Sequence, residues 1–126
     1  MKTLLKSLAL SAAVAPLLVA AAKADPVYMI AQIEIADHEA YFEQYGTSVS
    51  PIVIGAGAKV LVATPQVETL EGEWTGNWTV VLEFPSESAA MDSWYNSPEY
   101  EEVRELRFNT TTLNNLVIAP AFQPPA

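Results

Sequence analysis

The chain has 126 residues, with 15 acidic residues against 6 lysines and arginines, and its net charge is -9. This length suits one domain, and the acidic balance argues against nucleic acid and anionic membrane surfaces as partners, because both bind basic patches. With no cysteine, a single histidine and no complete phosphate-binding glycine motif, the sequence predicts no disulfide, no metal and no cofactor.

The first 24 residues have the pattern of a cleavable signal peptide. Two lysines precede an apolar run over residues 8–22, and Ala22-Lys23-Ala24 has the small-x-small form of a cleavage site. The run is shorter than the ~20 residues that a membrane-spanning helix needs, so we expect cleavage before Asp25 and not a membrane anchor. The mature protein would be periplasmic or extracellular. It would keep 3 basic and 15 acidic residues, a net charge of -12.

The mature part, residues 25–126, is expected to form one domain with its core between residues 27 and 119. Apolar residues alternate over residues 27–35, which is typical of a strand with one apolar face. Asp37 is a good N-cap for a following helix, which should kink or restart at Pro51.

Two more strands follow that helix. Residues 59–63 predict a second strand that is interrupted by Pro65 and resumes over residues 67–70. A turn-rich segment then leads to a third strand over residues 78–84.

The last third predicts a helix and a strand. Ser86 caps the helix, and Ser97-Pro98 caps its restart. Residues 109–114 are polar and predict a loop, and residues 115–119 predict a short final strand. The order β-α-β-β-α-β is that of an α+β, ferredoxin-like unit, a four-stranded antiparallel sheet with its helices on one face.

The other face of such a sheet would be left open, and its residues are only half polar. By alternation it carries Tyr28, Ile30, Gln32, Glu34, Thr79, Val81 and Glu83. A half-apolar open face usually meets a partner, and the simplest partner is a second copy packed sheet against sheet. Apolar groups and a few carboxylates would line the space between two such sheets, which describes a small-molecule pocket.

Several segments between about residues 28 and 119 form a specific pattern when they are taken in order. They are the opening strand with Asp37 to Tyr41, Gly55-Ala56-Gly57, VETLEGEW (67–74), VVLEFPS (80–86), Trp94-Tyr95 and NSPEY (96–100) with Leu106-Arg107. This pattern resembles the domain of unknown function 1330 family of the dimeric α/β-barrel superfamily. It implies the fold and a homodimer, but no reaction, because the family has no established one. The wider superfamily includes cofactor-free monooxygenases, lactone isomerases and haem-degrading enzymes.

Glu34 and Glu83 are the candidate catalytic bases. Both fall on the open face, where partial desolvation could raise the pKa of a carboxyl group. The alternative is that they are rim residues that face water or pair with an arginine across the dimer. His38, the only histidine, fits a solvated position in the first helical turn better than a catalytic base.

Arg107 is the candidate ligand-binding cation. No acidic residue lies three or four positions from it, so it needs either a tertiary partner, for which Glu83 is the candidate, or an anionic ligand. Arg104 has Glu101 at helical spacing and is expected to be solvated. The other candidate ligand contacts are Tyr28, Gln32 and Tyr100.

Three functions stay open on this evidence. The first is a homodimer that binds a small molecule between its sheet faces. The second is a cofactor-free enzyme for a small apolar or aromatic substrate, with Glu83 or Glu34 as base and Arg107 orienting an anionic group. The third is a purely structural dimer.

Overall fold

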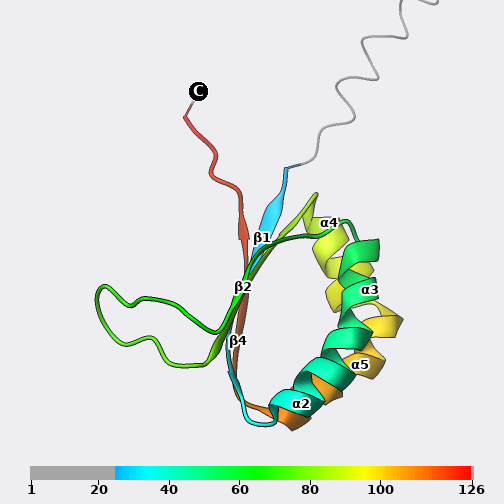
Figure 1. The fold of residues 1–126 in the computed structure, drawn as a ribbon. Helices are drawn as coiled ribbons and strands as arrows, with labels where there is room; N and C mark the ends of the chain where they lie inside the picture. Colours follow the sequence, from blue (N-terminus) through cyan, green and yellow to red (C-terminus); the bar gives the residue numbers. More distant parts are fainter. Residues whose placement is uncertain (1–24, 126) are drawn as a thin grey trace, which may run out of the picture.

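The structure is a computed structural model that describes residues 25–125. The signal peptide predicted for residues 1–24 lies outside the described residues. Four strands form one antiparallel sheet in the order β2-β3-β1-β4, and the helices form a layer on one face of it (Figure 1). This arrangement confirms the predicted ferredoxin-like architecture.

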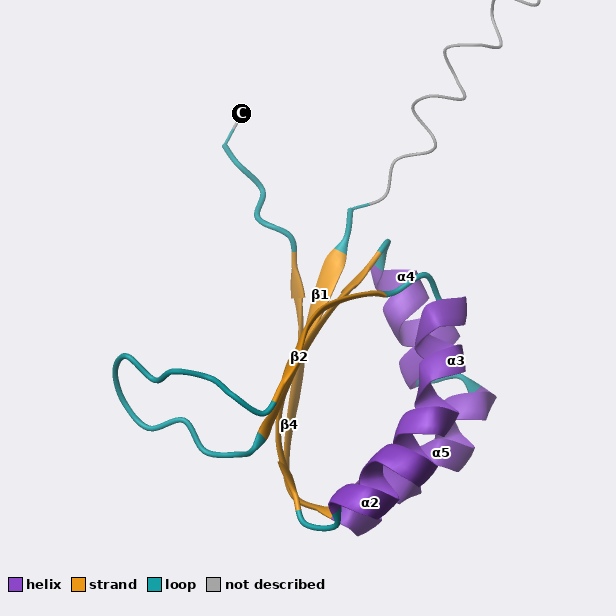
Figure 2. Cartoon of the chain, in the orientation of Figure 1, coloured by secondary structure: helices purple, strands orange, loops and turns teal. Residues whose placement is uncertain are grey.

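The strands are β1 (Val27–Ile35), β2 (Lys59–Thr64), β3 (Trp78–Phe84) and β4 (Thr111–Pro120). Figure 2 shows that the helices line one side of the sheet, while the loop between β2 and β3 projects from the other side. The predicted bounds of β1 and β3 are confirmed. Every second residue of β1, from Val27 to Ile35, is buried beneath the helices.

The first helical stretch comprises α2 (His38–Ala40), the π-helix η1 (Tyr41–Gly46) and α3 (Thr47–Gly55). Asp37 caps it, since its Oδ1 accepts a hydrogen bond of 3.0 Å from the Ala40 N–H. Helical structure continues through Pro51 to Gly55, and the helix type changes earlier, at Thr47. His38 is exposed in the first turn, as expected.

The second helical stretch comprises α4 (Glu87–Ala90), the π-helix η2 (Met91–Tyr95) and α5 (Pro98–Thr110). The predicted caps are present: Ser86 Oγ accepts from the Ala89 N–H at 3.0 Å, and Ser97 Oγ accepts from the Tyr100 N–H at 3.2 Å. Pro98 occupies the first turn of α5, where a missing N–H costs nothing.

The predicted strand over residues 67–70 is wrong, because residues 65–77 form a loop. The loop returns to β1, where the Asn77 N–H donates to the Ile33 carbonyl at 2.8 Å. Gly76 makes this approach possible. Its φ is +104°, and a Cβ there would lie 2.8 Å from the same carbonyl oxygen.

The loop predicted over residues 109–114 is also wrong, because α5 ends at Thr110 and β4 begins at the next residue. The hydroxyls of Thr110 and Thr111 donate to carbonyls of the last helical turn, at 2.8 Å to Leu106 and 2.7 Å to Arg107. These bonds satisfy the end of the helix locally, so no separate loop is needed. β4 then pairs with β1 along the whole length of β1.

Candidate functional site

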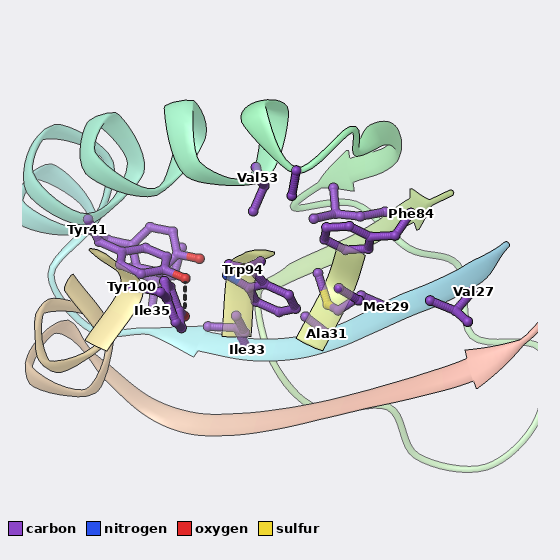
Figure 3. Packing of buried hydrophobic residues seen from close by; sticks show 14 residues of the cluster. Val27, Met29, Ala31, Ile33, Ile35, Tyr41, Val53, Phe84, Trp94 and Tyr100 are labelled. Carbon is purple, nitrogen blue, oxygen red and sulfur yellow. Dashed lines mark hydrogen bonds between the residues drawn. The ribbon is translucent and has the colours of Figure 1, made fainter. Parts of the chain in front are cut away.

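A cavity of about 220 Å³ lies within the helix-covered side of the molecule. Figure 3 shows the core around it, with Trp94 between Val53 of α3 and the β1 residues Ala31 and Ile33. The sheet supplies apolar side chains to its lining, and the helical layer supplies Tyr41, Tyr45, Trp94 and Arg107. Such a mainly apolar cavity with a few polar groups is typical of a small-molecule site.

A second hollow, of about 380 Å³, lies between the helices and the β4 edge of the sheet. Trp94, Arg107 and Leu116 line both spaces, so these three residues form the wall between them.

Both π-helices carry aromatic residues that line the cavity. η1 supplies Tyr41 and Tyr45, and η2 supplies Trp94. π-helical turns occur often at functional sites, because the extra residue in the turn changes where its side chains point.

Trp94 is held in place from two sides. Its ring stacks on Phe84, with 5.4 Å between centroids and 10° between planes. Ser97 Oγ donates to the Trp94 carbonyl at 2.7 Å, so the cap of α5 also fixes the end of η2. The indole N–H of Trp94 is buried, and it has no hydrogen-bond acceptor within residues 25–125.

Arg107 is only 3 % exposed. Its Nε donates to the Tyr100 hydroxyl at 3.3 Å, and its Nη1 donates to Asn114 Oδ1 at 2.9 Å. Asn114 is oriented in turn by its own amide, which donates to Thr111 Oγ1 at 2.6 Å. Burial lowers the pKa of Arg107, but the hydroxyls of Tyr100 and Tyr45 outweigh it and leave the pKa above its ordinary value. The guanidinium is therefore charged wherever the protein is folded.

Two further phenols surround this arginine. The hydroxyls of Tyr45 and Tyr100 are 2.7 Å apart and share a hydrogen bond, so Tyr45, Tyr100 and Arg107 form a chain. Burial raises the pKa of Tyr41 to about 12, and burial together with the nearby Tyr100 raises that of Tyr45 further. Both phenols are therefore neutral at physiological pH.

The structure brings two of the predicted site residues together, Arg107 and Tyr100, on the helix-covered side. The other four, Tyr28, Gln32, Glu34 and Glu83, alternate with buried residues and therefore lie on the open face. Their roles stay predictions.

Contacts on the open face tie two of these residues to their neighbours. Asn77 Nδ2 donates to Glu34 Oε2 at 3.1 Å, where the loop rejoins the sheet. Gln32 accepts from Asn115 Nδ2 at 2.9 Å and donates to the Thr75 carbonyl at 2.7 Å. These three hydrogen bonds give Glu34 and Gln32 a structural role, because they hold the loop and β4 to β1.

A salt bridge between Arg107 and Glu83 does not form, because the two residues lie on opposite faces of the sheet. Glu83 is flanked on β3 by Leu82 and Phe84, which point into the core, and it pairs across the strands with Lys59. Glu83 and Lys59 together line a shallow hollow at one end of the sheet. One protomer therefore cannot place Glu83 and Arg107 on the same small substrate.

The expectation that Arg104 is solvated is also wrong. Its guanidinium carbon lies 4.5 Å from the centroid of the Tyr95 ring and 5.2 Å from that of Tyr100, and Nη2 donates to the Tyr95 carbonyl. The two aromatic faces attract the cation more than the exposed Glu101 at helical spacing does.

Residues 25–125 contain neither a metal-binding cluster nor a membrane-spanning helix. This part of the chain contains no group of three or more His, Asp or Glu residues placed to hold a metal ion. No helix in the same range is long and apolar enough to cross a membrane.

The chain matches the family model described as domain of unknown function (DUF1330) over residues 26–121. It is a member of the DUF1330 family. The family predicted from the sequence motifs is therefore confirmed. No curated protein matches this DUF1330 protein.

Solved structures share the fold of this DUF1330 protein at low sequence identity. The RPA0582 protein of unknown function from Rhodopseudomonas palustris is 21 % identical, with a TM-score of 0.66 over 81 % of this chain and 86 % of that one. The Rv0793 structure from Mycobacterium tuberculosis is 16 % identical, with a TM-score of 0.50 over 80 % and 99 %. A putative antibiotic biosynthesis monooxygenase from Bacteriodes thetaiotaomicron is 18 % identical, with a TM-score of 0.48 over 81 % and 94 %. At these identities the likeness concerns the fold alone.

Sequence reasoning missed the polar contacts of Tyr45 and Asn114 in this DUF1330 protein. Asn114 falls in the loop predicted over residues 109–114. Asn114 follows the threonines that end α5, and a corrected end of that helix would have placed it beside Arg107.

Proposed function

We propose that this protein is a homodimer that binds a small organic molecule in the cavity between its sheet and its helices. The cavity of about 220 Å³ carries the proposal, because an apolar lining with a few polar groups suits a small organic ligand. A space of about 150 Å³ lined by apolar side chains is enough to bind benzene in another protein. The binding space proposed here lies within one protomer, and the sequence-based hypothesis placed it between two sheets.

The open face of the sheet supports the dimer. Val62, Val81, Ile30 and Val117 are paired across β2, β3, β1 and β4, so they form an apolar row over the full width of the sheet. Val117 is 55 % exposed and Val62 is 39 % exposed. A second copy packed on this row by a two-fold axis would remove it from water.

The loop over residues 65–77 supports the same partner. It projects from the open side of the sheet in Figure 1, and it carries Leu70, which is 85 % exposed, and Trp74, which is 44 % exposed. In a sheet-to-sheet dimer this loop would reach along the flank of the second protomer, where both side chains could be covered.

The cofactor-free enzyme stays an alternative, but its proposed residues are now divided. Glu34 and Glu83 lie on the open face, whereas Arg107 lies under the helices. An enzyme that uses the cavity would have to work with the Tyr45–Tyr100–Arg107 chain, in which no carboxylate takes part.

Native mass spectrometry of protein purified from its own host tests the proposal, because it reports the dimer mass and any retained ligand together. Ala63→Leu should narrow the cavity, which Ala63 lines, and should reduce the retained ligand at least about tenfold. Ala36→Leu makes the same change at an exposed residue outside the cavity lining and should leave the ligand unchanged. A ligand-free monomer would overturn the proposal, and an empty dimer would favour the structural dimer.

A further inference from the structure

The hydrogen bonds of Arg107 leave its charge uncompensated. The two bonds described above go to a phenol and to an amide oxygen, both of which are neutral. Within residues 25–125 no acceptor is bonded to its Nη2. A buried cation is normally paired with an anion, because water no longer stabilises its charge.

The missing anion is not supplied by the acidic residues of this chain. Although the sequence has 15 acidic residues, those near Arg107 in the sequence lie on exposed positions of α5, including Glu102 and Glu105. Glu83, the partner considered from the sequence, lies across the sheet. A buried cation among neutral groups in so acidic a protein favours an anion that comes from outside the chain.

Trp94 supplies an independent second observation. Its indole N–H is buried and lacks an acceptor within the described chain, and Trp94 shares the cavity wall with Arg107. Buried donors without acceptors are rare, because each costs about 1–3 kcal/mol of desolvation. The wall therefore holds a cation with a free N–H group and a neutral N–H donor, while much of the remaining lining is apolar.

We propose that the ligand of this cavity is a small organic acid with an aromatic or other compact apolar body, which rests on the proposed function above. Its carboxylate accepts from Nη2 of Arg107, and its second oxygen supplies the acceptor that the Trp94 indole N–H lacks within residues 25–125. The apolar body lies against Met29, Ala31 and Val80. A monocarboxylate matches one cation, whereas a phosphate dianion would need more donors than this wall provides.

Arg104 provides the matched control for this proposal. It lies one turn before Arg107 on α5 and carries the same charge, but it does not line the cavity. Its guanidinium lies on the Tyr95 ring and donates through Nη2 to the Tyr95 carbonyl, while its buried Nε has no acceptor within residues 25–125. Replacing Arg104 therefore changes the net charge equally and removes no donor from the wall.

The test compares benzoate with benzamide, a neutral molecule of nearly the same shape, by calorimetry on the mature chain. Wild-type protein should bind benzoate at least about tenfold tighter than benzamide. Arg107→Gln should lower the affinity for benzoate at least about thirtyfold and the affinity for benzamide less than threefold. Arg104→Gln should change neither affinity by more than about threefold. Trp94→Phe keeps a packed ring but removes the indole N–H, and it should lower the affinity for benzoate about fivefold. This variant provides the test if Arg107→Gln does not fold.

A second measurement locates the bound acid. The chain has three tryptophans, so an amide-proton NMR spectrum contains three indole N–H signals, and Trp94→Phe identifies the one of interest. Benzoate should shift the Trp94 signal most and leave that of Trp74, which does not line the cavity, nearly unchanged. Equal binding of benzoate and benzamide in the cavity would overturn the organic acid and leave the proposed function standing. If neither molecule binds, both the organic acid and the cavity site are wrong.

Discussion

The two faces of the sheet are built from the same alternating strands, yet the chain covers only one of them. On β1, Met29 and Ile33 are 4 % and 2 % exposed beneath the helices, while Ile30 and Gln32 between them stay partly exposed. The apolar row of the open face has no cover within residues 25–125. The difference separates the face that residues 25–125 cover for themselves from the face on which we propose that a second copy packs.

The covered face also holds the unusual chemistry. A cavity, a cation with neutral partners and a donor without an acceptor meet there around Trp94 and Arg107. The open face is chemically simpler, with an apolar row, a polar row through Gln32, and carboxylates toward its ends. We therefore propose ligand binding at the covered face and association at the open one.

Phe84→Ala should have the largest effect, because it removes a ring that is 0 % exposed and stacked on Trp94. We expect the free energy of unfolding to fall by about 3–5 kcal/mol. Val81→Ala, three residues earlier and on the open face, should cost about 1 kcal/mol in the monomer. Urea denaturation at low protein concentration compares the two. Equal losses would contradict the distinction between the faces.

The second-largest effect is expected from alkaline pH, which should lower the free energy of unfolding through the buried phenols of the covered face. The pKa of Tyr41 is about 12 in the folded protein and 10.0 when exposed, so the unfolded chain loses its proton first as the pH rises. The stabilisation is therefore complete below pH 10 and is lost as the pH rises through 12. Tyr45, whose pKa is raised in the same direction, adds to the loss. Each phenol contributes about 1.4 kcal/mol per pH unit, which gives roughly 3 kcal/mol in total at pH 11.

Tyr41→Phe isolates one part of this effect. It should reduce the loss of stability between pH 10 and pH 11 by about 1 kcal/mol, measured by urea denaturation at each pH. Tyr28→Phe removes a hydroxyl from the open face and is the matched control. If Tyr41→Phe loses as much stability as the wild type between pH 10 and pH 11, the loss does not come from the Tyr41 phenol.

Val81→Lys tests the open face directly, because it places a charge in the middle of the apolar row. We expect the dimer to dissociate at least about thirtyfold more readily, which corresponds to about 2 kcal/mol. Light scattering during gel filtration measures the mass at each concentration. Ser93→Lys adds the same charge at an exposed position of η2 and should leave the mass unchanged. An unaltered dimer in Val81→Lys would exclude this face as the interface.

The sequence predicted the strands and caps well, because those patterns are local. The alternation over β1 and β3 and the caps at Asp37, Ser86 and Ser97 depend only on neighbouring residues, and all of them are confirmed. The errors arose where contacts distant in the sequence decide the structure. The Asn77 bond to Ile33 turns residues 65–77 into a loop, and pairing with β1 extends β4 back to Thr111.

The site was less predictable for the same reason. The lack of an acidic residue at helical spacing singled out Arg107, and its contact with Tyr100 is now established. Its partner could not be chosen, since the face on which Glu83 lies depends on how the whole sheet packs. A cavity also leaves no sequence pattern, because it arises from residues of several elements that fail to fill the space between them.

The smallest effect is expected from removal of the predicted signal peptide. If residues 1–24 are a targeting segment and no part of the domain, the mature chain from Asp25 should unfold within about 0.5 kcal/mol of the full chain. Mass spectrometry of protein from its host should find Asp25 at the N-terminus, and Ala24→Trp should block the cleavage by placing a bulky residue where a small one is needed. Both faces of the sheet should be unaffected, because β1 begins at Val27, after the cleavage point. The signal-peptide prediction would be wrong if the mature protein keeps Lys2 and Lys6. It would also be wrong if truncation lowers the free energy of unfolding by several kcal/mol.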